Sequence, residues 1–134
     1  MPKTNNTRLI FVVDDEHVIA SSLALILRYQ GFNVDSFTDP YKVLQALETS
    51  VPDLLITDVV MPGFSGIELA IKIRESHPDC KEILFSGQTT TSELLKAASA
   101  NGHDFEILAK PVHPTDLLAR VRVNLGLETS PDQK

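Results

Sequence analysis

Short continuous runs of apolar residues alternate along this chain with stretches in which apolar residues recur every three or four positions. The runs at 9–13, 54–58 and 83–86 are typical of strands that are covered on both faces of a parallel sheet. A weaker and more exposed strand is expected at 33–37, and a fifth strand at 105–110. Between these strands, stripes of apolar residues indicate amphipathic helices, as with Ile19, Leu23, Ile26 and Leu27 or Leu117, Leu118, Val121 and Leu125.

Capping signals mark where several of the helices should begin. Asp39 before Pro40 predicts a capped helix start, and the pairs Ser65 with Glu68 and Thr90 with Glu93 predict capping boxes. Five strands alternating with five helices predict a doubly wound α/β domain. Right-handed crossovers then place the carboxyl ends of all the strands at one edge of the sheet.

Length and charge narrow the class of protein further. The 134 residues suit one domain, which we expect at 8–125, with a disordered arm at 1–7, a flexible polar tail at 126–134 and no room for an output domain. Eighteen acidic against twelve basic residues give a net charge of −6, which argues against direct binding to nucleic acid or to an anionic membrane. A single cysteine excludes an internal disulfide, and no long apolar run suggests a signal peptide or membrane span, so a cytoplasmic protein is expected.

The candidate chemistry lies at the predicted strand ends. Asp14 and Asp15 follow the first strand, Asp58 ends the third, Ser86 ends the fourth and Lys110 ends the fifth. Neighbouring strands are about 4.8 Å apart, so a lysine two strands away, at roughly 10 Å, could still reach an aspartate. Closely spaced carboxylates repel unless a cation intervenes, and an all-oxygen ligand set suits Mg²⁺. Asp58 could then attack phosphorus while the ion, Lys110 and Ser86 stabilise the phosphoryl oxygens.

Each of these residues also has an ordinary structural interpretation. An aspartate pair after a strand is more often a helix cap, Asp58 could simply begin a turn, and Lys-Pro dipeptides are common. Taken singly, each residue favours that interpretation, and only their placement at matching strand ends makes coincidence improbable. The loop after the first strand has no glycine-rich phosphate cradle, and the four histidines show no ligand spacing.

The ordered motifs resemble the receiver domain of two-component response regulators. The matching segments lie at 11–16, 53–58, 61–63, 84–87 and 110–111, so the resemblance covers about residues 8 to 125. It implies a flavodoxin-like fold, a five-stranded parallel sheet of order 2-1-3-4-5 with five helices. It also implies a phosphoacceptor signalling domain, not an enzyme with a separate substrate, which takes a phosphoryl group from the phosphohistidine of a sensor histidine kinase or phosphotransfer protein.

The resemblance also assigns roles to individual residues. Asp58 becomes the phosphoacceptor, and Asp15, Asp58 and the backbone carbonyl of Val60 become direct Mg²⁺ ligands, with Asp14 acting partly through water. Ser86 corresponds to the hydroxyl residue that turns toward the phosphoryl group, and Lys110 to its ion-pair partner. The output would be a surface near the fourth helix and fifth strand, read by an unknown downstream protein or used in a phosphorylation-linked homodimer.

One departure concerns the aromatic residue that receivers usually carry three positions before the lysine. This chain has Ile107 there, and Phe105 lies two residues earlier on the same predicted strand face. The stretch from Gly102 to Lys110 also looks one residue longer than usual, which would allow a bulge that re-aims Phe105. The resemblance therefore does not extend to a coupling of Ser86 to an aromatic side chain.

Three alternatives remain open. The chain could be a receiver-like adaptor that acts by binding alone, or the receiver part of a longer regulator. It could also be an aspartyl-phosphate hydrolase of the haloacid dehalogenase type, but such enzymes carry a second aspartate two residues after the nucleophile, where this chain has Val60.

Overall fold

Five parallel strands form the central sheet of the protein. The computed structural model describes residues 8–63, 65–87, 96, 99–100, 102, 105–110 and 112–127. The sheet has the order β2-β1-β3-β4-β5, all pairs being parallel. Its strands are β1 (Leu9–Val13), β2 (Asn33–Phe37), β3 (Leu54–Asp58), β4 (Lys81–Ser86) and β5 (Glu106–Ala109). The predicted α/β class and strand order are confirmed.

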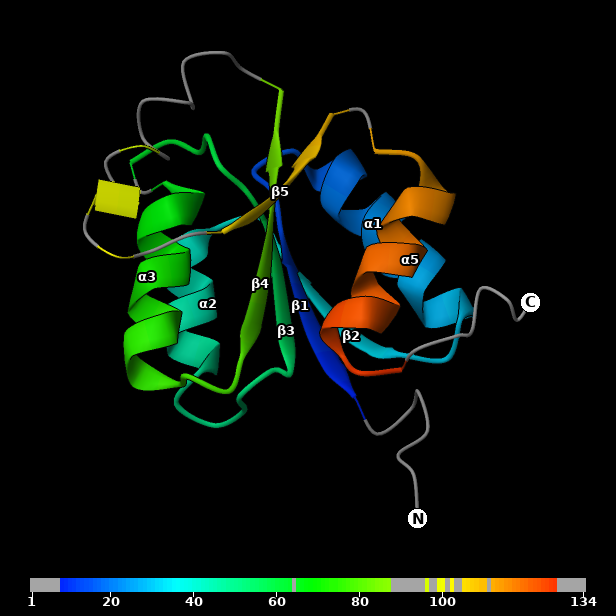
Figure 1. The fold of residues 1–134 in the computed structure, drawn as a ribbon, viewed down its shortest axis with the longest axis horizontal. Helices are drawn as coiled ribbons and strands as arrows, with labels where there is room; N and C mark the ends of the chain where they lie inside the picture. The colour runs from blue at the N-terminus through cyan, green and yellow to red at the C-terminus, as the bar shows by residue number, and fades with distance from the viewer. Residues whose placement is uncertain are drawn as a thin grey trace.

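Helices cover both faces of this sheet (Figure 1). Helices α1 (His17–Tyr29) and α5 (Pro114–Asn124) lie on one face, and α2 (Pro40–Ala46) and α3 (Gly66–Ser76) on the other. The remaining predicted helix, over 90–102, and its capping box fall mostly outside the described residues, among which Lys96, Ser99 and Ala100 are helical. The four helices named here agree with the alternating pattern of the sequence.

Two of the predicted helix starts have the expected caps. The carboxylate of Asp39 accepts a hydrogen bond from the backbone N–H of Tyr41 at 2.9 Å. At α3 the Ser65 hydroxyl accepts from the Glu68 N–H, and the Glu68 carboxylate accepts from the Ser65 N–H. Reciprocal bonds of this kind satisfy donors that the first helical turn leaves unpaired, so the start of α3 is fixed just after β3.

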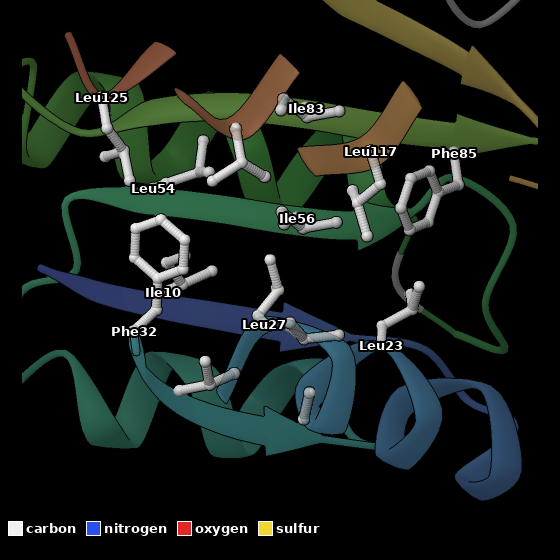
Figure 2. Close-up of a cluster of buried hydrophobic side chains, with 14 residues drawn as sticks. Ile10, Leu23, Leu27, Phe32, Leu54, Ile56, Ile83, Phe85, Leu117 and Leu125 are labelled. Atoms are coloured by element: carbon white, nitrogen blue, oxygen red, sulfur yellow. The ribbon is translucent and has the colours of Figure 1, made fainter. Parts of the chain in front are cut away.

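The sheet divides the hydrophobic core into two layers. On the α1 and α5 side, alternate residues of the inner strands pack against the helices. Ile10, Ile56 and Phe85 share this layer with Leu27 of α1 and Leu117 of α5 (Figure 2). The other residues of the same strands, among them Phe11, Leu55 and Leu84, pack against α2 and α3. Because β1, β3 and β4 are buried on both faces, their sequences are continuous apolar runs.

The ends of the chain lie largely outside the described residues, including the predicted arm at 1–7. Of the predicted tail at 126–134, only Gly126 and Leu127 are described. The Leu127 N–H donates to the Arg122 carbonyl at 2.8 Å, and its side chain packs against the core layer of α1 and α5. The packed part of the chain therefore includes Leu127.

The lengths and compositions of the helices can be compared with those of membrane-crossing helices. Within the described part of the chain, none of them combines the length and the apolar character that a membrane-crossing helix requires.

Candidate functional site

The carboxyl ends of the inner strands bring the candidate residues to one edge of the sheet. Asp14 follows β1 directly, Asp58 is the last residue of β3 and Ser86 is the last residue of β4. Lys110 follows β5, and its backbone N–H donates to the Ser86 carbonyl at 3.1 Å. Four strands therefore contribute to one site, as the alternating pattern predicted.

Three carboxylates come together at this edge. Oxygen atoms of Asp14, Asp15 and Asp58 all lie within 4.8 Å of one another, and among the described residues this is the group of acidic, histidine or cysteine side chains that could hold a metal ion. Asp14 is fully buried and Asp58 is 7% exposed, while Asp15 is exposed to solvent. The cluster is therefore enclosed on the protein side and open at Asp15.

Lys110 joins the two buried members of the cluster. Its Nζ lies 3.1 Å from Asp14 Oδ2 and 3.2 Å from Asp58 Oδ2. The lysine side chain does span from β5 across β4 to β3 and β1, as its length allows. The three carboxylates and this one ammonium together carry a formal charge of 1 − 3 = −2.

Burial and charge shift the pKa values of this group. Burial raises the pKa of Asp58 above its usual value; attraction by Lys110 lowers it and repulsion by Asp14 raises it again, with a net upward shift. Burial alone would lower the pKa of Lys110, but the hydrogen bonds to and attraction by Asp14 and Asp58 outweigh it, so the pKa is raised. The lysine is therefore held in its charged form, and Asp58 binds a proton more tightly than a free aspartate does.

Asp14 also makes the local bond expected of an ordinary turn residue. Its Oδ1 accepts from the Glu16 N–H at 2.9 Å, one residue before α1 begins, and Glu16 itself makes no side-chain capping bond. The expected helix-cap role of Asp14 is therefore wrong, because Glu16 is the N-cap residue of α1 and Asp14 makes a turn bond just before the helix. This turn bond accounts for one carboxylate oxygen, while the other faces Lys110.

Val60 follows Asp58 by two residues, and Ser86 ends the neighbouring strand β4. The backbone N–H of Val60 donates to the Asp58 carboxylate and favours its charged form, while the Val60 side chain is 46% exposed. Ser86 is half-buried, and its register partner in β5 is Ala109, the residue just before Lys110. All the residues that the sequence singled out therefore occur around one edge.

Two residues that the sequence analysis did not assign to the site also touch Asp58. The Thr57 hydroxyl donates to the backbone carbonyl of Asp58 at 2.9 Å, and Gly66 packs directly against that carbonyl. Thr57 immediately precedes Asp58 in the sequence, but nothing in the local pattern distinguishes its hydroxyl from any other strand threonine. The approach of Gly66 depends on how α3 folds back and has no signal in the sequence beyond the glycine itself.

The stretch before Lys110 carries no aromatic residue at the position where receivers have one. Ile107 pairs with Leu84, and the register runs without a skipped residue from Ile83 with Glu106 to Ser86 with Ala109. Phe105 packs against the α2 and α3 core layer, and the guanidinium carbon of Arg74 lies 4.2 Å from the centroid of its ring. No bulge therefore interrupts β5 over 106–109, and Phe105 is held against α3.

Comparisons with known proteins agree with this geometry. The family model for the response regulator receiver domain matches residues 10–122. The regulatory protein VanR from Enterococcus faecium is 32% identical over 116 residues, which are 87% of this chain and 49% of VanR. The chain spans about half the length of the curated relatives it matches.

Solved structures show the same fold. A CheY-like receiver domain protein from Methanospirillum hungatei JF-1 is 28% identical, covering 90% of this chain and 94% of its own, with a TM-score of 0.80. The receiver domain of DrrB, activated with BeF3, is 28% identical, covering 89% and 97%, with a TM-score of 0.76. Since the family model covers most of the chain, this chain belongs to the family of response regulator receiver domains.

Proposed function

We propose that this protein is a phosphoacceptor signalling domain in which Asp58 receives a phosphoryl group from a phosphohistidine. An Asp58 carboxylate oxygen forms the new bond to phosphorus, the bond from phosphorus to the imidazole nitrogen breaks, and the imidazole leaves with the electron pair. The observation that carries the proposal is the placement of Asp58 beside two further carboxylates and one lysine, at the end of a central strand. The product is an acyl phosphate, which water can hydrolyse.

The donor set fits a magnesium ion. It contains only oxygen ligands, and its formal charge of 1 − 3 = −2 matches one divalent cation. The pKa of Asp58 is raised, first by burial and then by repulsion from Asp14, so Lys110 alone does not offset these two effects. We assign Asp15, Asp58 and the Val60 carbonyl as direct ligands. Asp14 would act through water, since its two oxygens already serve Glu16 and Lys110. When bound, the ion supplies positive charge to the phosphoryl oxygens.

Lys110 and Ser86 complete the proposed site. The Lys110 ammonium, which now bridges Asp14 and Asp58, would donate to a phosphoryl oxygen once Asp58 is modified. The Ser86 hydroxyl would donate to another oxygen from the neighbouring strand. Such contacts exist only in the phosphorylated state, and they are what could shift the protein between two conformations.

The partner of this reaction would be a histidine kinase or a phosphotransfer protein. An apolar groove of about 470 Å³ runs beside Lys110, lined by residues of α1 such as Val18 and Ile26 together with Phe85 and Val112. A helical donor protein could bury this groove and hold its phosphohistidine over Asp58. In this proposal the domain carries no separate catalytic activity, and its output is a surface read by a downstream protein or by a second copy.

Two other functions are alternatives to this proposal. A binding-only adaptor has no need for three carboxylates around a lysine, so the site favours a phosphoacceptor. Because the matched relatives are about twice as long, the same site could instead regulate a further domain of a longer protein.

The decisive experiment is labelling with acetyl phosphate and Mg²⁺, followed by intact-mass measurement. We expect the native protein to gain one phosphoryl group and Asp58→Asn to gain none. Asp35→Asn, an exposed carboxylate on the edge strand β2, is the matched control and should label like the native protein. Equal labelling of Asp58→Asn and the native protein would refute the assignment of the acceptor.

A further inference from the structure

The backbone around Asp58 is held by contacts that the proposed chemistry does not itself use. Thr57 is fully buried, between Val13 of β1 and Leu84 of β4 in the register. Its hydroxyl donates to the Asp58 carbonyl oxygen at 2.9 Å. The one hydrogen-bonding group of this side chain is thus directed at the backbone of the acceptor residue.

Gly66, the first residue of α3, closes the other side of the same carbonyl. A Cβ at Gly66 would lie 1.9 Å from the Asp58 carbonyl oxygen and 3.0 Å from Thr57 Oγ1, so no other residue fits without a shift of the backbone. The Gly66 N–H donates to the Val59 carbonyl at 2.8 Å, and the Val59 N–H donates to the Phe85 carbonyl at 3.0 Å. Both peptide groups that follow Asp58 are therefore fixed from neighbouring elements.

We infer that Thr57 is a positioning residue for the proposed phosphoryl acceptance, acting through the backbone of Asp58. Its hydroxyl, with Gly66 packed beside it, sets the orientation of the Asp58–Val59 peptide. The orientation of that peptide determines the position of the Val60 N–H, which donates to the Asp58 carboxylate. It thereby determines how the carboxylate is oriented toward Lys110. This inference rests on the proposed function of Asp58.

The hydroxyl is the group that this role requires. Valine has nearly the shape of threonine but no donor, so it would leave the buried Asp58 carbonyl without the bond it now accepts. Gly66 offers no side chain to replace it. The Asp58–Val59 peptide would then be oriented from one side alone, by the bond of the Val59 N–H to the Phe85 carbonyl. A misplacement of reacting groups by about 1 Å can lower a rate by about a hundredfold, so a small tilt of this peptide would slow phosphorylation.

The test compares Thr57→Val with Thr57→Ser, which removes a methyl group but keeps the hydroxyl. With acetyl phosphate and Mg²⁺ we expect Thr57→Val to label roughly fivefold more slowly or worse at saturating donor, and Thr57→Ser to stay within about twofold of the native rate. In metal-free protein, the amide resonance of Val60 should move in Thr57→Val and not in Thr57→Ser. Labelling of Thr57→Val at the native rate would overturn the inference.

Ile73→Val is the matched stability control, since it removes one buried methyl group of α3 away from the site. It should label at the native rate, and an equal loss of rate in Ile73→Val would also overturn the inference, because the effect would then be general. If Thr57→Val does not fold, Thr57→Cys replaces it, because a thiol is only a weak hydrogen-bond donor. Thr57→Cys should then label more slowly than Thr57→Ser, and equal rates would overturn the inference. Failure of the proposed function would look different, as absence of Asp58-dependent labelling in the native protein.

Discussion

Replacing Asp58 by asparagine should make the metal-free protein more stable at neutral pH. The relevant carboxylate oxygens lie within 4.8 Å of one another, so at an effective dielectric constant near 20 each pair of full charges repels by about 3.5 kcal/mol. Attraction between Asp58 and Lys110 at 3.2 Å is worth about 5 kcal/mol on the same basis. Burial of the Asp58 charge adds a further cost, and the raised pKa shows that the costs prevail.

The expected gain is a small difference between these opposing contributions, on the order of 1 kcal/mol in the free energy of unfolding. Its sign depends on pH. Because the pKa of Asp58 is raised in the folded state above its model value of 3.8, native stability falls as pH rises past that value and levels off above the raised pKa. Asp58→Asn lacks this loss, so its advantage should grow between those two pH values and then stay constant.

Urea unfolding with and without Mg²⁺ measures both effects. At about ten times its dissociation constant, Mg²⁺ should stabilise the native protein by about 1.4 kcal/mol and should stabilise Asp58→Asn much less. Asp35→Asn should follow the native protein in all conditions. The reasoning is refuted if Asp58→Asn is less stable than the native protein in chelator at neutral pH, or gains as much from Mg²⁺.

Three further predictions follow from the same site. Lys110→Met should lower the free energy of unfolding by about 3 kcal/mol in urea titrations, since it leaves buried Asp14 beside Asp58 with no cation; a change below about 0.5 kcal/mol would contradict the bridging role. The Mg²⁺ affinity measured by calorimetry should rise with pH up to the raised pKa of Asp58, by up to about tenfold per pH unit, and a flat profile would exclude Asp58 as a ligand. Val18→Asn should slow transfer from a kinase found by phosphotransfer profiling and leave labelling by acetyl phosphate unchanged, whereas equal rates from the kinase would remove the α1 groove as the donor contact.

Much of the fold could be read from local patterns because two physical rules dominate it. Strands covered on both faces are mostly apolar, so the apolar runs of β1, β3 and β4 could be recognised in the sequence. The first turn of a helix needs side-chain acceptors for its free N–H groups, so Asp39 and Ser65 could be recognised as caps. Boundaries were less accurate: β4 begins at Lys81, two residues before its apolar run, because the backbone of Lys81 pairs with that of Leu54 whatever its exposed side chain is.

Which residues could meet at the site was predictable from the order of strands and helices along the chain, since parallel strands with right-handed crossovers bring their carboxyl ends to one edge. How these residues meet depends on the packing of the folded protein. It placed one Asp14 oxygen on a turn and the other on Lys110, left Asp15 open to solvent, and pressed Gly66 against the Asp58 carbonyl. These contacts join elements far apart along the chain, and their distances follow from how the helices pack on the sheet, which no local pattern of residues encodes.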